Sequence, residues 1–352
     1  ITCDPAPPAL FSSSAGTLGA FGPLEPWPTI PTHAALLPDS TIISWYSRDT
    51  VGLGRDWDYN NQARHNSTIV DSWNMNNNVH TRRDNTTTDL FCAGFAQTFD
   101  GRLFVAGGNL GSLDGNYYPG SVHTNIFNPS NNSWTRAPDM TEGRWYPTVI
   151  ALPNKDMLVM SGWSNTTTTN NYIADVWNPA TNTLRRLTSA STQGRSVQHL
   201  YPWLHVAPNG QVFYSGSTVS MAYLNTTSTG SWSTTYNRDS TGRTNGSSVM
   251  YEPGKLLVVG GGGNTRTAVT INLTSGVQTT AAGSMTFGRT HLNATLLADG
   301  TVFVNGGNTS GTNFDDTTSI YSSELWNLET GEWQLGALAQ KLRNYHALSI
   351  LL

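Results

Sequence analysis

A cysteine and a tyrosine stand at the same distance before two similar segments of the chain. The interval from Cys92 to Gly107 equals the interval from Tyr146 to Ser161. Gly107 and Ser161 each follow a short apolar run, so the two positions share a register. A lone cysteine is ordinarily a small buried hydrophobe. At a position equivalent to that of a phenol, we expect the thiol to take part in chemistry.

Two further candidates follow the same spacing. The interval from His291 to Gly306 is again the same, and Tyr345 follows His291 by the interval that separates Cys92 from Tyr146; His346 comes next. If the segments are structural repeats, these side chains converge. Imidazole nitrogen and phenolate oxygen suit copper(II) better than zinc or magnesium. The alternative is a polar mouth without chemistry, since no short ligand motif such as His-x-His is present.

The elements that must position these residues form a repeat of about 40 to 55 residues, a period typical of β-propellers. Each unit contains an apolar run that ends in small residues, preceded by a turn with Asp, Asn or Gly and followed by a second hairpin. The runs are Gly101–Gly108, Met157–Gly162, Gln211–Gly216, Leu256–Gly261 and Thr301–Gly307, and Thr41–Trp45 is an earlier degenerate copy. Each unit therefore reads as four strands, and the paired glycines as close contacts between neighbouring blades.

These units predict an all-β protein, a seven-bladed kelch β-propeller over residues 32–352 after an N-terminal segment, residues 1–31. Six units are complete, and Tyr345–Leu352 reads as the first strand of a seventh. A single strand would leave an open blade edge, which propellers avoid by closure. We therefore expect a removed or separate second polypeptide to supply the rest of blade seven, with domain swapping as a weaker option.

Arginines precede the repeated position in several units. They are Arg144, Arg195, Arg243, Arg289 and, in looser register, Arg343. A cation repeated in this way indicates a structural role that bridges blades.

Composition excludes some classes of partner. Charged residues make up 12% of the chain, about half the ~25% of an ordinary soluble protein. The net charge of −4 has no basic cluster behind it, so we expect no nucleic-acid partner. No apolar run approaches the ~20 residues of a membrane span, so we expect no membrane partner.

Two features indicate a secreted, extracellular glycoprotein. The chain begins at Ile1, as after removal of a leader. Sequons for N-glycosylation occur at Asn66, Asn85, Asn131, Asn165, Asn225, Asn245, Asn272, Asn293 and Asn308.

Four segments resemble the copper radical oxidases, a family that includes galactose oxidase and glyoxal oxidase, and they are most similar to the glyoxal oxidase branch. In chain order they are Phe91-Cys92-Ala93-Gly94, Gly143-Arg144-Trp145-Tyr146-Pro147-Thr148, Leu200-Tyr201-Pro202-Trp203-Leu204-His205 and Arg343-Asn344-Tyr345-His346. The kelch resemblance covers almost the whole chain from about Thr32 onward.

The resemblance implies a catalytic site. Cys92 and Tyr146 match the pair that forms a thioether, a protein-derived radical cofactor whose phenol is also a copper ligand. Tyr345 matches the axial tyrosinate that acts as general base, and His346 matches one equatorial histidine. Such a site oxidises a small aldehyde or primary alcohol with O₂ and releases hydrogen peroxide, with copper as Lewis acid and one-electron centre.

The chain also departs from the family pattern. In the family the second equatorial histidine comes from a C-terminal β-sandwich domain, which we expect to be absent here. These 352 residues alone would then bind copper weakly and be inactive, unless another polypeptide supplies the missing part. The segment Leu200–Pro202 has no arginine for gripping a sugar, which favours small aldehydes or primary alcohols over galactose. Trp163 matches the tryptophan stacked on the thioether only with a one-residue slip, and a core or rim tryptophan is an equal alternative.

Other assignments stay open. His291 either lines the substrate pocket or is a satisfied structural histidine, while His199 and His205 receive no role. Cys3 is a candidate to tether the missing C-terminal portion through a disulfide.

The rival to the oxidase hypothesis is a catalytically silent kelch propeller that binds carbohydrate or protein through the same mouth, because fold does not fix function. A calcium-dependent lectin has little support, since no Asp-rich loop repeats across the units.

Overall fold

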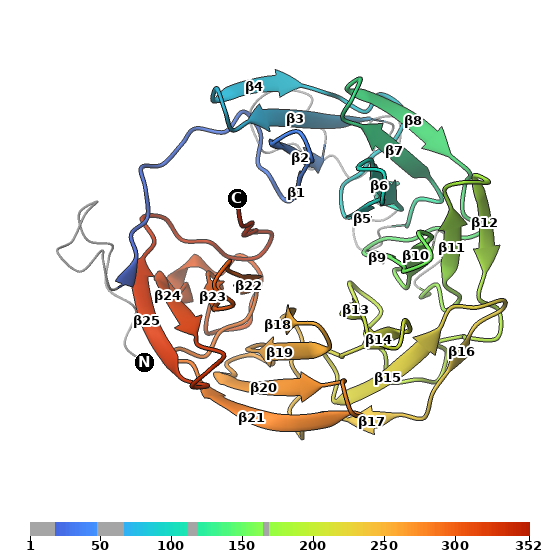
Figure 1. Cartoon of the computed structure of the whole chain (residues 1–352). Helices are drawn as coiled ribbons and strands as arrows, with labels where there is room; N and C mark the ends of the chain where they lie inside the picture. Colours follow the sequence, from blue (N-terminus) through green and yellow to red (C-terminus); the bar gives the residue numbers. More distant parts are fainter. Residues whose placement is uncertain (1–17, 48–66, 111–118, 165–168) are drawn as a thin grey trace.

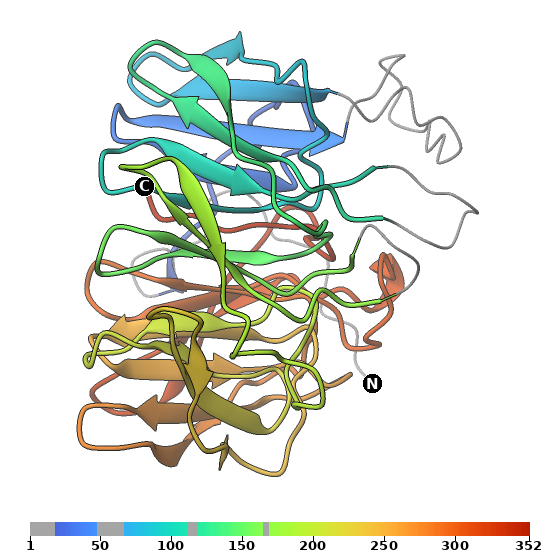
Figure 2. The same cartoon turned by 90° about the vertical axis from the view of Figure 1, so that its right-hand side faces the viewer.

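The computed structural model describes residues 18–47, 67–110, 119–164 and 169–352. These residues form six antiparallel sheets around a central axis, so the prediction of an all-β propeller is confirmed. The innermost strands surround the axis and the outermost strands form the circumference (Figure 1). Figure 2 shows the same disc from its edge, with the strands crossing its thickness. No helix in these four ranges is long and apolar enough to span a membrane.

The first three blades have four strands each, in the order inner to outer. Their strands are β1 (His33–Leu36), β2 (Thr41–Ser47), β3 (Thr68–Asn74), β4 (Val79–Arg82), β5 (Gly94–Gln97), β6 (Leu103–Ala106), β7 (Thr124–Asn128), β8 (Ser133–Ala137), β9 (Thr148–Ala151), β10 (Met157–Met160), β11 (Asp175–Asn178) and β12 (Thr183–Arg186).

Blades 4 to 6 continue the pattern, with a fifth short strand in blade 4. Their strands are β13 (Leu204–Val206), β14 (Val212–Tyr214), β15 (Ser220–Asn225), β16 (Ser231–Trp232), β17 (Tyr236–Asn237), β18 (Ser247–Glu252), β19 (Lys255–Val259), β20 (Thr267–Asn272), β21 (Gln278–Ser284), β22 (Asn293–Leu296), β23 (Val302–Asn305), β24 (Ser322–Trp326) and β25 (Trp333–Leu338). A 3₁₀ turn at Asp316–Thr318 lies between β23 and β24.

The expectation of a seventh blade needs correction, because the described residues form six blades. Tyr345–Leu352, predicted as the first strand of blade seven, forms no strand. It lies inside the ring near blade 6, where the Thr295 hydroxyl donates to the Ser349 carbonyl at 3.4 Å. The physical reason is pairing: a strand is stable only beside a partner that takes up its backbone groups, and this segment has none within the described part of the chain.

The turn between the third and fourth strands starts in the same way in every blade. The third strand ends in an asparagine, or is followed by one, whose side-chain oxygen accepts the backbone N–H two residues later, which starts the turn. These residues are Asn74, Asn128, Asn178, Asn225, Asn272 and Asn327. The turn signals recognised in the sequence thus set the period of the fold.

The hydrophobic core is divided among the junctions between blades. Five clusters of buried residues each join two consecutive blades, from blades 1 and 2 to blades 5 and 6. Successive side chains of a strand point to opposite faces of the blade, so each strand contributes residues to the junctions on both sides. A sixth, smaller cluster at the axis contains Phe91, Cys92 and Tyr146.

The paired glycines at the ends of the second strands allow the blades to meet. A Cβ atom on Gly107 would lie 2.4 Å from the carbonyl oxygen of Arg144 in the next blade, and one on Gly306 would lie 2.7 Å from that of Arg343. Both glycines also have a positive φ, at 81° and 68°.

Three of the repeated arginines have a structural role, but their side chains bond within one blade instead of bridging two blades as expected. Arg144, Arg243 and Arg289 are buried, and each donates to the carbonyl at the end of the second strand of its own blade. Arg144 also pairs with Asp175, and Arg289 with Glu324, at 2.5 and 2.7 Å.

The other two arginines depart from that pattern. Arg195 lies over the ring of Trp232 at 5.4 Å, and Arg343 is exposed. In blade 4, Arg238 fills the buried position instead and donates to the carbonyls of Ser215 and Gly216.

Part of the N-terminal segment packs against the first blade and against the last blade. Trp27 contacts Trp73 and His80 of blade 1 and donates its indole N–H to Ser44 at 3.0 Å. Phe21 contacts Phe303 of blade 6, with ring centroids 6.4 Å apart. Cys3 lies outside the described residues, so its pairing stays a prediction.

Candidate copper site

Six residues at the axis share one unusual backbone conformation. Five of them stand just before the first strand of blades 2 to 6, the sixth lies in the terminal segment, and each has φ between 47° and 69° although none is glycine. They are Cys92, Tyr146, Tyr201, Asn245, His291 and His346. This left-handed conformation costs about 1–2 kcal/mol for an L-residue. We refer to these six residues as the axial ring.

Backbone hydrogen bonds link neighbouring members of the axial ring. The N–H of Tyr146 donates to the carbonyl of Cys92, that of Tyr201 to Tyr146, and that of His291 to Asn245, at 2.7–2.9 Å. The shared register of Cys92, Tyr146 and His291 inferred from spacing therefore has a structural counterpart. In the last segment, His346 occupies the ring position and Tyr345 precedes it.

Three of the predicted site residues bring their polar atoms together. The Tyr146 hydroxyl lies 2.5 Å from the Tyr345 hydroxyl and 3.0 Å from Nε2 of His346. Two phenols and an imidazole thus converge, although Tyr146 and His346 are 200 residues apart in the sequence. The rings of Tyr345 and His346 are stacked, with centroids 3.9 Å apart.

Cys92 lies beside Tyr146 in the axial cluster. Its side chain is fully buried, and its thiol forms a hydrogen bond with Tyr146. Burial raises the pKa of Cys92 well above its usual range, and burial followed by the nearby Cys92 raises the pKa of the Tyr146 phenol. Both groups therefore stay protonated until a cation or an oxidant changes them.

Two tryptophans lie on one side of Tyr146. Trp145 is in direct contact, with ring centroids 3.9 Å apart, and Trp163 lies against Trp145 at 4.9 Å. The two tryptophans also pair through a backbone bridge. The structure thus places the predicted stacking residue Trp163 one ring further out. Sequence reasoning missed Trp145, because adjacent side chains of an extended segment ordinarily point to opposite sides.

His33 is a second residue that sequence reasoning missed. Its Nε2 accepts the backbone N–H of Cys92 at 2.9 Å, and its ring stacks on Trp45 at 5.4 Å. Burial, followed by the nearby His346, lowers the pKa of His33 to about 3, so the ring stays a neutral acceptor. No signal in the sequence links His33 to Cys92, because His33 lies in an ordinary first strand.

We expect the substitution His33→Leu to lower the free energy of unfolding by ~1–3 kcal/mol, because it leaves the buried Cys92 N–H without an acceptor. Urea denaturation measures this effect. The variant His33→Gln keeps a side-chain acceptor and should recover part of the loss. Equal losses in both variants would show that ring packing, and not the hydrogen bond, is the stabilising contact.

His291, another member of the axial ring, lies beside Tyr345. Its ring centroid lies 5.0 Å from that of Tyr345, and its Nε2 is buried without a hydrogen-bond partner among the described residues. Burial lowers the pKa of His291, and burial followed by the nearby His291 lowers that of His346 to about 4. His291 is thus placed at the rim, with one ring nitrogen unsatisfied.

Phe314 covers Tyr345 and His346 from the solvent side. Its ring centroid lies 5.1 Å from Tyr345 and 5.7 Å from His346, yet 57% of the side chain is exposed. Its φ of 58° is strained for an aromatic residue. An isolated phenylalanine within the polar run Thr312–Thr318 was the available sequence signal.

The ligands available to a metal at the axis are mainly phenolic oxygens. No group of three or more His, Cys, Asp or Glu side chains that could hold a metal occurs in the described ranges. A metal here would therefore rely on phenolic oxygen, and the converging atoms are the Tyr146 and Tyr345 hydroxyls and His346 Nε2. A nitrogen and oxygen donor set of this kind suits copper(II).

A family model described as "Glyoxal oxidase N-terminus" matches residues 55–251, more than half of the chain. The chain belongs to this family. The glyoxal oxidase N-terminus match covers the segments of Cys92, Tyr146 and Tyr201 but not those of His291, Tyr345 and His346.

Curated relatives place this family member among the copper radical oxidases. Two galactose oxidases from Gibberella zeae are each 27% identical to the chain over 368 residues. The alignment covers 95% of this chain and 51% of each relative, so the chain spans about half the length of the curated relatives it matches.

A solved structure agrees with this placement. A fungal alcohol oxidase of the AA5 family, determined in complex with copper, superposes with a TM-score of 0.81 at 25% identity. The match covers 94% of this chain and 69% of that chain. None of the comparisons supports the expected second polypeptide.

Proposed function

We propose that the chain carries the radical and copper site of an extracellular oxidase that converts small aldehydes or primary alcohols and releases hydrogen peroxide. The observation that carries the proposal is the convergence of the Tyr146 and Tyr345 hydroxyls with His346 Nε2, beside the buried Cys92. Similarity to a galactose oxidase and to a copper-bound alcohol oxidase supports the same reaction class.

In this proposal Tyr146, Tyr345 and His346 hold the copper ion, and Cys92 and Tyr146 form the thioether. Bound copper would supply Lewis acidity toward the substrate oxygen and accept one of the two electrons. Oxidation of a primary alcohol then balances as one alcohol and one O₂ giving one aldehyde and one hydrogen peroxide. An aldehyde reacts as its hydrate, so one aldehyde, one water and one O₂ give one carboxylic acid and one hydrogen peroxide.

The chain's own residues divide the remaining work. Tyr345 accepts the hydroxyl proton of the substrate as general base. The oxidised, cross-linked Tyr146, as a phenoxyl radical, takes the hydrogen atom from the adjacent carbon and becomes a phenol. The Tyr146 and Tyr345 oxygens lie 2.5 Å apart. This proximity lets Tyr345 take the hydroxyl proton and Tyr146 take the hydrogen atom from neighbouring atoms of one bound substrate.

Three other residues shape this site. Trp145 and, behind it, Trp163 shield the Tyr146 ring from water, which preserves a reactive radical. We assign His291 to the substrate pocket, because its unsatisfied Nε2 can accept a hydrogen bond from a substrate hydroxyl. Secretion also belongs to this proposal, because the product is hydrogen peroxide and the chain is rich in sequons.

Formation of the thioether tests the proposal without any assay of turnover. Protein treated with copper(II) in air should yield, after proteolysis, Cys92 and Tyr146 peptides joined with a loss of two hydrogens, measured by mass spectrometry. Cys92→Ser should abolish the joined species and leave Tyr146 in a linear peptide. Separate peptides from the copper-treated wild type would contradict the proposal and favour a silent propeller that binds carbohydrate or protein.

A further inference from the structure

A cleft of about 350 Å³ lies at the outer edge of the propeller, between blades 1 and 2. It lies beside β4 and β8, the outermost strands of these blades, away from the axis (Figure 1). Three arginines line it, Arg82, Arg83 and Arg136, and Asp84 is the single carboxylate among its lining residues. The cleft therefore carries an excess of positive charge.

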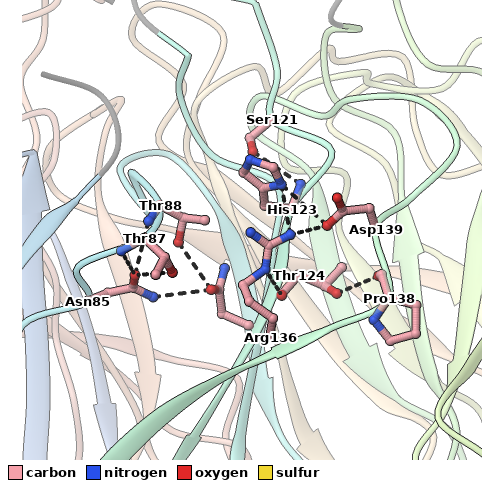
Figure 3. A network of polar contacts seen from close by, with 10 residues as sticks. Asn85, Thr87, Thr88, Ser121, His123, Thr124, Arg136, Pro138 and Asp139 are labelled. Carbon is pink, nitrogen blue, oxygen red and sulfur yellow. Dashed lines mark hydrogen bonds and ion pairs between the residues drawn. The ribbon is translucent and has the colours of Figure 1, made fainter. Parts of the chain in front are cut away.

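Two of the three arginines have protein partners. Arg82 donates through Nε to Asp84 at 2.8 Å. Arg136 donates to the Thr124 carbonyl and contacts His123 and Asp139, and Figure 3 shows how these contacts fix its side chain. These pairs neutralise part of the charge and hold both guanidinium groups in place.

Arg83 differs from them. Its Nε is buried without a hydrogen-bond partner among the residues that the structure describes. Five other arginines also have an unbonded Nε, but their terminal nitrogens bind carbonyls or carboxylates. A buried donor without an acceptor is destabilising, and the cost is larger for a charged group. An anionic oxygen bound in the cleft would remove that cost.

The fold itself does not require an arginine at this place. At three junctions a tryptophan on a fourth strand donates its indole N–H to a carbonyl of the preceding blade. Trp134 donates to Arg83 at 2.6 Å, Trp232 to Ala190 at 2.9 Å and Trp333 to Ala282 at 2.8 Å. Only the backbone carbonyl of the acceptor residue is used, and alanine serves at the other two junctions. The long cation of Arg83 is thus additional to the architecture.

The wall of the cleft is held rigidly. The side-chain oxygen of Asn85 accepts from the N–H groups of Thr87 and Thr88 at 2.9 and 3.0 Å, and its amide donates to Asn125 (Figure 3). Thr86 and Asn132 also line the cleft and are exposed. Hydroxyl and amide groups next to a cation can bind the hydroxyls of a sugar ring.

We propose that this cleft binds an anionic sugar, with Arg83 holding its carboxylate or sulfate. A guanidinium fork binds two oxygens of either group at once, whereas a neutral sugar offers no such partner. The site lies apart from the axial ring, so it would attach the protein to acidic polysaccharide without occupying the oxidase site.

Calorimetric titration of the copper-free protein with sodium glucuronate tests the proposal, with glucose and sodium sulfate as comparison ligands at constant ionic strength. Glucose differs from glucuronate only at C6, where a hydroxymethyl group replaces the carboxylate. We expect glucuronate to bind at least tenfold more tightly than glucose, and Arg83→Gln to weaken glucuronate at least tenfold. Binding of sulfate as well would extend the site to sulfated sugars, and binding of glucuronate alone would restrict it to uronic acids.

Arg195→Gln is the matched control, because Arg195 lies against Trp232 at an equivalent junction and lines no part of this cleft. It should leave glucuronate affinity unchanged. Arg83→Lys keeps the charge but not the guanidinium fork, so it should bind glucuronate with intermediate affinity. Such graded binding would show that the loss in Arg83→Gln does not come from misfolding. Equal affinity for glucose and glucuronate, absence of glucuronate binding, or wild-type affinity in Arg83→Gln would overturn the proposal.

Discussion

Replacement of Tyr146 by phenylalanine is expected to lower the affinity for copper(II) by about 100-fold or more. The Tyr146 hydroxyl contacts both Tyr345 and His346, so its removal opens the centre of the donor set. Loss of a residue that merely supports a metal ligand already costs ~10–100-fold in affinity. A competition titration with a copper chelator, followed by the electron paramagnetic resonance signal of bound copper(II), measures the change.

Tyr201→Phe provides the control for this experiment. Tyr201 holds the equivalent backbone position in the next segment and contacts the Tyr146 ring, but its hydroxyl donates to the Ala93 carbonyl at 3.1 Å. This variant should keep copper affinity within about threefold of wild type. A parallel loss in both variants would mean that packing around the axis, and not the Tyr146 oxygen, governs copper binding.

The second large effect concerns stability. Arg289→Leu should reduce the free energy of unfolding by ~3–5 kcal/mol, because it leaves Glu324 buried without its cation. Both side chains are fully buried, and Glu324 also accepts the backbone N–H groups of Thr286 and Phe287. The midpoint and slope of urea denaturation give the change.

Two variants make this result interpretable. Arg343→Leu removes an exposed arginine of the same repeat and should change stability by no more than ~0.5 kcal/mol. The double variant Arg289→Leu with Glu324→Leu replaces the ion pair by apolar side chains and should recover much of the loss. A loss below ~1 kcal/mol for Arg289→Leu would contradict the importance of the pair.

Much of this arrangement could be predicted from the sequence, because the fold is repetitive. The shared offset before Gly107 and Ser161 placed Cys92 and Tyr146 at equivalent points, and one hydrogen-bonded segment per blade turns that offset into proximity. The turn residues and apolar runs located the hairpins for the same reason. A repeat converts spacing along the chain into position around an axis.

What the sequence could not predict lies outside the repeat. His33 reaches Cys92 from another blade, and Trp145 turns toward Tyr146 because its neighbour has a left-handed backbone. In blade 4, Arg238 and not Arg195 fills the buried position, and it reaches the second strand from the opposite direction along the chain. The terminal segment from Tyr345 fails as a strand because pairing depends on a neighbour and not on its own residues.

The axial ring has a consequence for how such a site can change through evolution. A cysteine, two tyrosines, an asparagine and two histidines all adopt one backbone conformation there, and five of them are linked by main-chain bonds that do not involve their side chains. Residue type at these six points is therefore separable from the path of the chain. Single-codon changes can exchange a thiol, a phenol, an imidazole or an amide while the blades stay where they are, so new reactivity can be sampled on an unchanged frame.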